Sequence, residues 1–126
     1  MSAEARDALT EKVIGHAIAI HRALGPGLLE SAYEECLCYE LRTAGIAYRR
    51  QLPLPVVYKE IKLDAAYRID VLVEETLILE LKAVEQVNRL HEAQLLTYLR
   101  LGGYSTGLII NFCTPVLKDG IRRMKL

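Results

Sequence analysis

The sequence predicts an α/β (α+β) fold, in which a mixed central β-sheet of four to five strands is flanked by helices. Three observations carry this prediction. Apolar residues recur at helical spacing near the N-terminus, the middle is rich in Ile, Val, Leu and Tyr, and another helical segment precedes the last apolar runs. The expected element order is α-α-β-β-β-α-β-β. With 126 residues, the chain is most simply one domain spanning 1–126.

Two helices are expected before the first strand. A wide apolar stripe that includes Val13 and Ala17 predicts the first helix over about residues 3–24. The stretch "LGPGLL" then ends it, because glycine and proline interrupt helices. The second helix is expected over about 29–44, and Gly45 follows it at the position of a left-handed C-terminal cap.

Strands are expected in most of the remaining chain. Segments dominated by Ile, Val, Leu and Tyr predict three of them, near 46–58, 62–73 and 77–83. Pro53 and Pro55 indicate that the first is an edge strand or is irregular there. A third helix is expected over about 88–101, ended by Gly102 and Gly103. After it, "YSTGLIINF" predicts a fourth strand and "GIRRMKL" a short fifth.

Charge and cysteine content limit the classes of protein and partner. With 16 basic and 16 acidic residues the net charge is zero, so nucleic-acid binding would depend on local patches or a partner. No apolar run approaches the ~18 residues of a membrane span, and the polar N-terminus is unlike a signal peptide. An odd number of cysteines (Cys36, Cys38 and Cys113) indicates a reducing compartment. We therefore expect a cytoplasmic protein with no membrane association.

Two opposite charges, Glu80 and Lys82, interrupt the apolar run "TLILELKAVEQ". Side chains alternate along a strand, so both charges lie on one face, while apolar residues on both faces predict a strand covered on both sides. If Glu74–Thr76 form a three-residue hairpin loop, Asp70 lies opposite Glu80, and Arg68 lies opposite Lys82. Two opposed carboxylates have Cβ atoms ~4.5–5.5 Å apart and repel, which favours a divalent cation such as Mg²⁺ between them.

Ordinary ion pairs are the alternative explanation for these charges. Glu80 could pair with Lys82 and Asp70 with Arg68, since structural ion pairs also cluster charges. The same alternation separates two faces of the preceding strand, with Arg68, Asp70 and Leu72 on one and Ile69, Val71 and Val73 on the other.

The order of these residues resembles a known pattern. Asp70, a nine-residue gap and then "ELK" match D-Xn-(D/E)-X-K, the core of the PD-(D/E)XK nuclease superfamily, with "RID" where the name has Pro-Asp. "GLLESAY", with Gly27, Glu30 and Tyr33, resembles the G-x-x-E-x-x-Y pattern of a family of short bacterial and archaeal proteins in that superfamily. "QLLTY" resembles the Q-x-x-x-Y motif of its helicase-associated exonuclease branch. The resemblance covers about residues 24–123 and implies a restriction-endonuclease-like core.

The resemblance implies roles for individual residues. Asp70, Glu80 and the backbone carbonyl of Leu81 would bind the metal, and Lys82 would be the catalytic lysine that positions or activates the attacking water. Glu30 would complete or orient the metal site from the first turn of its helix, where the dipole favours negative charge. Substrate contacts are implied for Gln94, Tyr98 and Tyr33. Core packing of Tyr98 and backbone capping by Gln94 stay open. His91 is expected to be structural or exposed, and His16 and His21 to lie on a packed or interfacial helix.

The implied reaction is hydrolysis of phosphodiester bonds in nucleic acid with Mg²⁺ or Mn²⁺, with DNA favoured over RNA. Candidate contacts to the phosphate backbone are Arg49, Arg50, Lys59, Lys62, Arg68, Arg122, Arg123 and Lys125. Two alternatives stay open: a catalytically silent nuclease-fold module that works with a protein partner or as a homo-oligomer, and a hydrolase of a small phosphorylated substrate. The presence of Asp70, Glu80 and Lys82 favours an enzyme, whereas zero net charge favours the alternatives.

Overall fold

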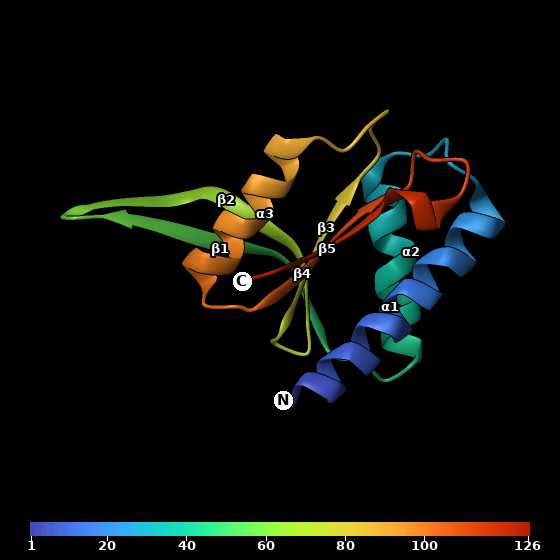
Figure 1. Ribbon diagram of the computed structural model, residues 1–126, viewed down its shortest axis with the longest axis horizontal. Coiled ribbons are helices and arrows are strands. Elements are labelled where there is room, and N and C mark those ends of the chain that lie inside the picture. The colour runs from blue at the N-terminus through green and yellow to red at the C-terminus, as the bar shows by residue number, and fades with distance from the viewer.

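A computed structural model, which describes the side chains of residues 1–63 and 67–126, shows a mixed sheet with helices on both faces (Figure 1). In chain order the elements are α1 (Ala3–Leu24), α2 (Glu30–Thr43), β1 (Tyr48–Tyr58), β2 (Ile61–Val73), β3 (Leu77–Lys82), α3 (Arg89–Gly102), β4 (Thr106–Asn111), a 3-10 turn η1 (Leu117–Gly120) and β5 (Ile121–Lys125). The predicted fold class and element order are confirmed.

The sheet has five strands in the order β1-β2-β3-β4-β5. Neighbouring strands are antiparallel except for β3 and β4, which are parallel and are joined through α3. β1 lies at an edge of the sheet, as Pro53 and Pro55 predict, because proline cannot donate a ladder hydrogen bond.

Local signals set the helix boundaries. The side chain of Ser2 accepts a hydrogen bond from the Ala5 amide and caps α1, whose bounds match the prediction. Gly45 follows α2 with φ 73°, and Gly103 follows α3 with φ 76°; both are left-handed conformations that glycine adopts without strain. His91 belongs to a capping box with Asn88 at the start of α3, so its role is structural.

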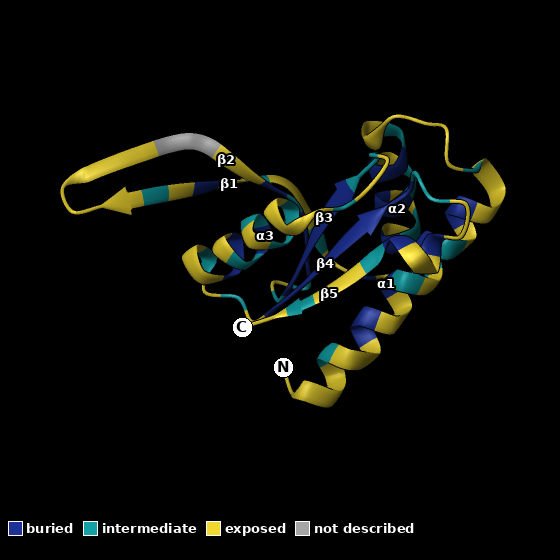
Figure 2. Cartoon of the chain, turned by 45° about the horizontal axis from the view of Figure 1, so that its top comes forward, coloured by how far each residue is buried: buried dark blue, intermediate teal, exposed yellow. Residues whose placement is uncertain are grey.

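Two hydrophobic cores lie on opposite faces of the sheet. The α1–α2 core packs both N-terminal helices on one face and includes Leu37 and Leu79. The α3 core packs the third helix on the other face and includes Leu95 and Ile78. β3 contributes to both cores and is buried from Leu77 to Leu81, so the charges near its end lie in largely apolar surroundings (Figure 2).

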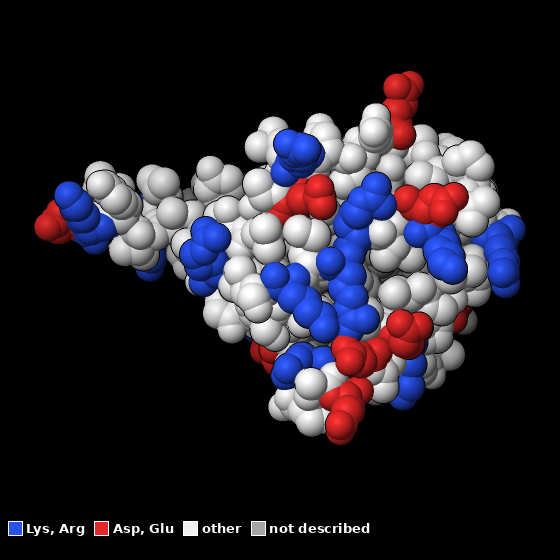
Figure 3. Space-filling model, in the orientation of Figure 1, with Lys and Arg blue, Asp and Glu red and all other residues white. Residues whose placement is uncertain are grey.

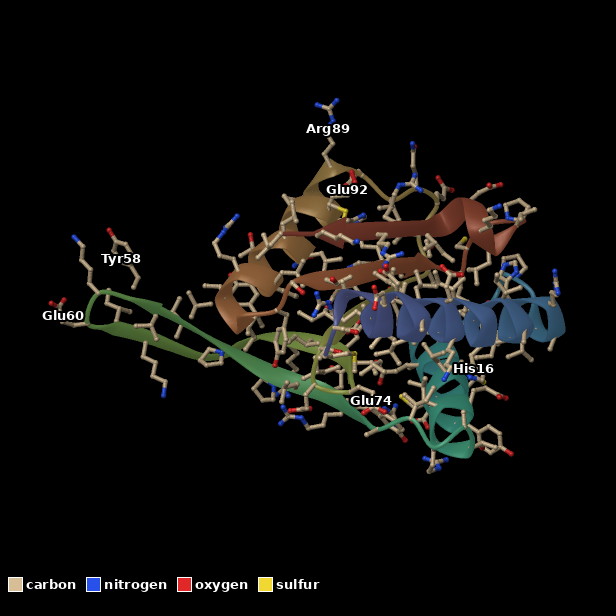
Figure 4. All side chains as sticks on the ribbon, turned by 60° about the horizontal axis from the view of Figure 1, so that its bottom comes forward. His16, Tyr58, Glu60, Glu74, Arg89 and Glu92 are labelled. Atoms are coloured by element: carbon tan, nitrogen blue, oxygen red, sulfur yellow. The ribbon has the colours of Figure 1, made fainter. Side chains whose placement is uncertain are left out.

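The outer part of the β1–β2 hairpin projects away from the body of the molecule (Figures 1 and 2). We call residues 56–63 the arm. It exposes the large apolar side chains of Val57, Tyr58, Ile61 and Leu63. Figure 4 places Tyr58 and Glu60 at its tip, far from α1. In the part of the chain that the structure describes, no helix combines the length and the apolar character needed to cross a membrane.

Candidate active site

The β2–β3 hairpin has the register predicted for a three-residue loop. Val73 pairs with Leu77 and Val71 pairs with Leu79, and the ladder ends at this second pair. Beyond it the two strands diverge (Figure 1), and Oδ2 of Asp70 accepts a hydrogen bond from the Leu81 amide at 2.8 Å. The Asp70 side chain thus accepts the Leu81 hydrogen bond that a backbone carbonyl of β2 would accept in a continuous ladder.

The expectation that Ile69 shares a face with Val71 and Val73 is wrong. Val71 and Val73 lie in the α1–α2 core, whereas Ile69 lies in the α3 core. The change of face coincides with Asp70 and with Gln51 of β1, which has φ 49° and lies between the same two ladder pairs of the β1–β2 hairpin.

Glu80 is a buried carboxylate with an unsatisfied oxygen. Its side chain is 7% exposed, and Oε1 has no hydrogen-bond partner among the residues that the structure describes. Burial first, and the charge of Asp70 second, raise the pKa of Glu80 to about 8, while Lys82 opposes the shift. A divalent cation would satisfy this oxygen and remove the repulsion, so the donor set fits an oxygen-binding metal such as Mg²⁺.

Asp70 is half-buried, and its surroundings also disfavour its charge. Burial is the largest cause that raises its pKa, and the hydrogen bond from the Leu81 amide is the largest that lowers it. The charge of Glu34 raises the pKa further and that of Lys82 lowers it. Because the N–H and C=O of a strand residue point to the same edge, the Leu81 carbonyl is directed to the side on which Asp70 lies.

The alternative ion pairs are not seen. Within residues 1–63 and 67–126, no carboxylate lies within salt-bridge distance of the Lys82 ammonium, although its field reaches both Asp70 and Glu80. Arg68 donates instead to the carbonyl of Gln51 at 3.3 Å. The Lys82 side chain is therefore near both carboxylates without being bound to either.

Among the described residues, Glu30 does not form a three-residue cluster with Asp70 and Glu80. Among the described side chains, no group of three His, Cys, Asp or Glu residues is close enough together to hold a metal ion. Glu30 begins α2 with an exposed side chain, and its charge raises the pKa of Asp70 and Glu80 as the weakest contribution to each. Its charge therefore acts on both carboxylates, and its role in completing or orienting the metal site stays a prediction.

Tyr33 lies in the α1–α2 core and has no exposed surface. Its ring stacks on Phe112 with centroids 4.2 Å apart, and its hydroxyl donates to the Gly25 carbonyl and accepts from the Leu28 amide. Tyr33, the last residue of the G-x-x-E-x-x-Y pattern, thus stabilises the loop that precedes α2. We do not retain it as a substrate contact.

Gln94 and Tyr98 lie on one face of α3 and contact each other. The Gln94 amide donates to the Tyr98 hydroxyl at 3.2 Å. Tyr98 is 6% exposed in the α3 core, and burial, followed by the charge of Glu80, raises its pKa. The pair is therefore close enough to Glu80 to feel its charge, although most of the Tyr98 ring serves packing.

Glu34 is a residue at the site that sequence reasoning missed. It is 7% exposed, and its Oε2 accepts from two nitrogens of Arg50 at 2.9 and 3.1 Å, while its Oε1 accepts from Gln51 at 2.8 Å. The sequence signal that could have indicated a buried Glu34 is its position on the apolar face of α2, which it shares with Cys38.

Asn111 is a second missed residue. It pairs with Lys82 in the β3–β4 ladder and is 1% exposed. Its amide group donates to the Val84 carbonyl at 2.8 Å and accepts from the Val84 amide at 3.1 Å, which fixes the chain that follows Lys82. The sequence signal that could have indicated its role is a polar residue at the end of an otherwise apolar strand.

Several candidate phosphate contacts already have acidic partners. Arg49 donates to both oxygens of Glu75 at 2.7 and 2.9 Å, and Arg123 pairs with Asp7, which also lies 4.0 Å from Lys125. Figure 3 shows Lys and Arg side chains gathered over the middle of one face, with acidic side chains beside them. The surface is mixed in charge, in agreement with the zero net charge.

A family model described as the PD-(D/E)XK nuclease superfamily matches residues 7–124, which include every residue of the site. Searches of curated proteins and of solved structures found no significant match.

Proposed function

Because this chain belongs to the PD-(D/E)XK nuclease superfamily, we propose that it hydrolyses phosphodiester bonds of nucleic acid in a reaction that depends on Mg²⁺ or Mn²⁺. The observation that carries the proposal is the buried Oε1 of Glu80, which has no partner in the described part of the chain and lies beside Asp70 where β2 and β3 separate. The charged form of a carboxyl group is unfavourable in such surroundings unless a cation binds there.

Asp70, Glu80 and the Leu81 carbonyl would hold the cation. When bound, it supplies Lewis-acid polarisation of the phosphoryl group. Asp70 is oriented for this task by the Leu81 amide, and Glu80 by its burial in β3. Lys82, which has no carboxylate within salt-bridge distance in the described part of the chain, would place positive charge where negative charge develops on the phosphate. Gln94 and Tyr98 would border the substrate from α3.

We further propose membership of the G-x-x-E-x-x-Y family, supported by Gly27, Glu30 and Tyr33 in "GLLESAY". DNA is the favoured substrate. Because the surface is mixed in charge, a protein partner or a second copy of the chain would strengthen its hold on nucleic acid. Cys36, Cys38 and Cys113 are free thiols, which supports a reducing compartment such as the cytoplasm.

The test is cleavage of labelled DNA and RNA, single- and double-stranded, in Mg²⁺, in Mn²⁺ and in chelator. Asp70→Asn, Glu80→Gln and Lys82→Met should each lower the rate by at least about 100-fold, a usual loss for a group that stabilises a transition state. Glu85→Gln and Lys118→Met remove the same charges from exposed positions and should leave the rate unchanged.

Other outcomes separate the alternatives. Cleavage that survives both Asp70→Asn and Lys82→Met would refute the assignment of the site. Metal-dependent hydrolysis of bis(p-nitrophenyl) phosphate without cleavage of any nucleic acid would indicate a small phosphorylated substrate. A chain that neither cleaves these substrates nor binds Mn²⁺ would be a nuclease-fold module without turnover.

A further inference from the structure

Along the β1–β2 hairpin, the side of the sheet to which alternate side chains point switches at one place. On β1, Tyr48 packs against the α1–α2 core, whereas Leu52 packs against the α3 core. On β2, Val71 and Ile69 are divided in the same way. Residues separated by an even number of positions share a face in a regular strand, so both strands depart from regular geometry within the same short stretch.

Gln51 and Asp70 lie at the centre of this change. The ladder pairs Arg50 with Val71 and Leu52 with Ile69, and passes over the two residues between them. Gln51 has φ 49°, a left-handed conformation that residues other than glycine seldom adopt. Nothing in a glutamine side chain favours this conformation, so contacts from elsewhere must hold it.

Those contacts fix Gln51 on two sides. Its side-chain amide donates to Oε1 of Glu34 at 2.8 Å, and its carbonyl accepts from Arg68 at 3.3 Å. Glu34 is itself held by Arg50, which also donates to Glu35 at 2.7 Å. The buried side chain of Glu34 on α2 thus binds Gln51, the residue of β1 with the left-handed conformation, which lies beside Asp70.

The consequence appears at Asp70. The pairing of β2 with β3 begins only at Val71, and the carboxylate of Asp70, one residue earlier, accepts a hydrogen bond from the Leu81 amide. We propose that Glu34 and Gln51 are positioning residues: they hold the left-handed turn of β1 that swings β2 away from β3 and aims the Asp70 carboxylate at Leu81 and Glu80. Their importance for metal binding rests on the proposed function, whereas their effect on Asp70 does not.

The Leu81 amide reports the position of Asp70 without any metal. We would measure hydrogen exchange by NMR on the metal-free full chain, for Gln51→Ala and Glu34→Ala, with the Leu108 amide of β4 as the internal reference. Exchange at Leu81 should rise by about tenfold or more in both variants, while Leu108 changes by less than about twofold.

Two further variants separate positioning from general structural damage. Glu35→Ala removes an exposed partner of Arg50 that does not contact Gln51, and should leave Leu81 protected. Glu34→Gln keeps an oxygen for Gln51, and should restore protection that Glu34→Ala loses. If Glu34→Ala does not fold, Gln51→Ala and Glu34→Gln still carry the test.

Mn²⁺ calorimetry on the same variants completes the experiment. Gln51→Ala should weaken binding by about tenfold, in step with the loss of protection at Leu81. Unchanged exchange at Leu81 in both Gln51→Ala and Glu34→Ala would overturn the inference. If the wild type binds no Mn²⁺ but Leu81 responds as expected, the proposed function fails and the positioning role stands.

Discussion

The carboxyl group of Glu80 is buried beside that of Asp70, and its Oε1 has no hydrogen-bond partner among the described residues. Leaving a buried polar atom without a partner costs about 1–3 kcal/mol, and more when the group is charged. Lys82 offsets part of this cost, yet it forms no ion pair with Glu80 in the described part of the chain. At the scale of single residues, the metal-free site therefore lowers the stability of the fold.

The pH dependence of stability follows from this cost. The pKa of Glu80 rises from 4.5 to about 8 on folding, so the folded chain keeps a proton that the unfolded chain has released in this range. Stability should therefore fall as pH rises from about 4.5 to about 8. In chelator, Glu80→Gln should flatten this fall in thermal denaturation and be more stable than wild type at pH 8, by on the order of 1–3 kcal/mol. A variant less stable than wild type at pH 8 would contradict the assignment.

Tyr33 offers a second test at the residue scale. Tyr33→Phe removes a hydroxyl that binds the Gly25 carbonyl and the Leu28 amide, and should lower the free energy of unfolding by roughly 1–2 kcal/mol. KM for a cleaved substrate should stay unchanged at temperatures where the variant is folded. Tyr39→Phe, at an exposed position of the same helix, is the control. A raised KM without any loss of stability would reinstate Tyr33 as a substrate contact.

At the scale of elements, short-range signals made the boundaries predictable from the sequence. Gly45 and Gly103 end helices because each allows a left-handed residue there, and the loop Glu74–Thr76 fixes the register that brings Asp70 towards Glu80. The change of faces at Gln51 was not predictable. Its cause is Glu34, which lies 17 residues away on another element, and no local propensity of glutamine indicates it.

The arm gives a prediction of its own, because it projects from the body and its apolar side chains are exposed. Ile61 is 57% exposed, so Ile61→Ser should change the midpoint of thermal unfolding by less than about 2 °C. Ile69→Ser is the matched control on the same strand, where the side chain is fully buried, and should lower stability by about 2–4 kcal/mol. A large loss of stability in Ile61→Ser would show that the arm packs against the body.

At the scale of the whole molecule, the site forms where β3 passes between the two cores and β2 turns away from it. The proximity of Asp70, Glu80 and Lys82 was predictable from the sequence, because the register of the β2–β3 hairpin brings them together. The exposed position of Glu30 was not predictable, because it depends on how α2 approaches the sheet, which no sequence spacing specifies. The same tertiary approach places Glu34, rather than Glu30, inside the protein beside Asp70.

Binding of Mn²⁺ tests the central claim most directly. Calorimetric titration of the full chain at neutral pH should show saturable binding by the wild type. Binding should weaken at least about tenfold in Asp70→Asn and in Glu80→Gln, as removal of one ligand group predicts, and stay unchanged in Glu85→Gln. Wild-type affinity in Glu80→Gln, or no binding by the wild type, would contradict a metal site formed by Asp70 and Glu80.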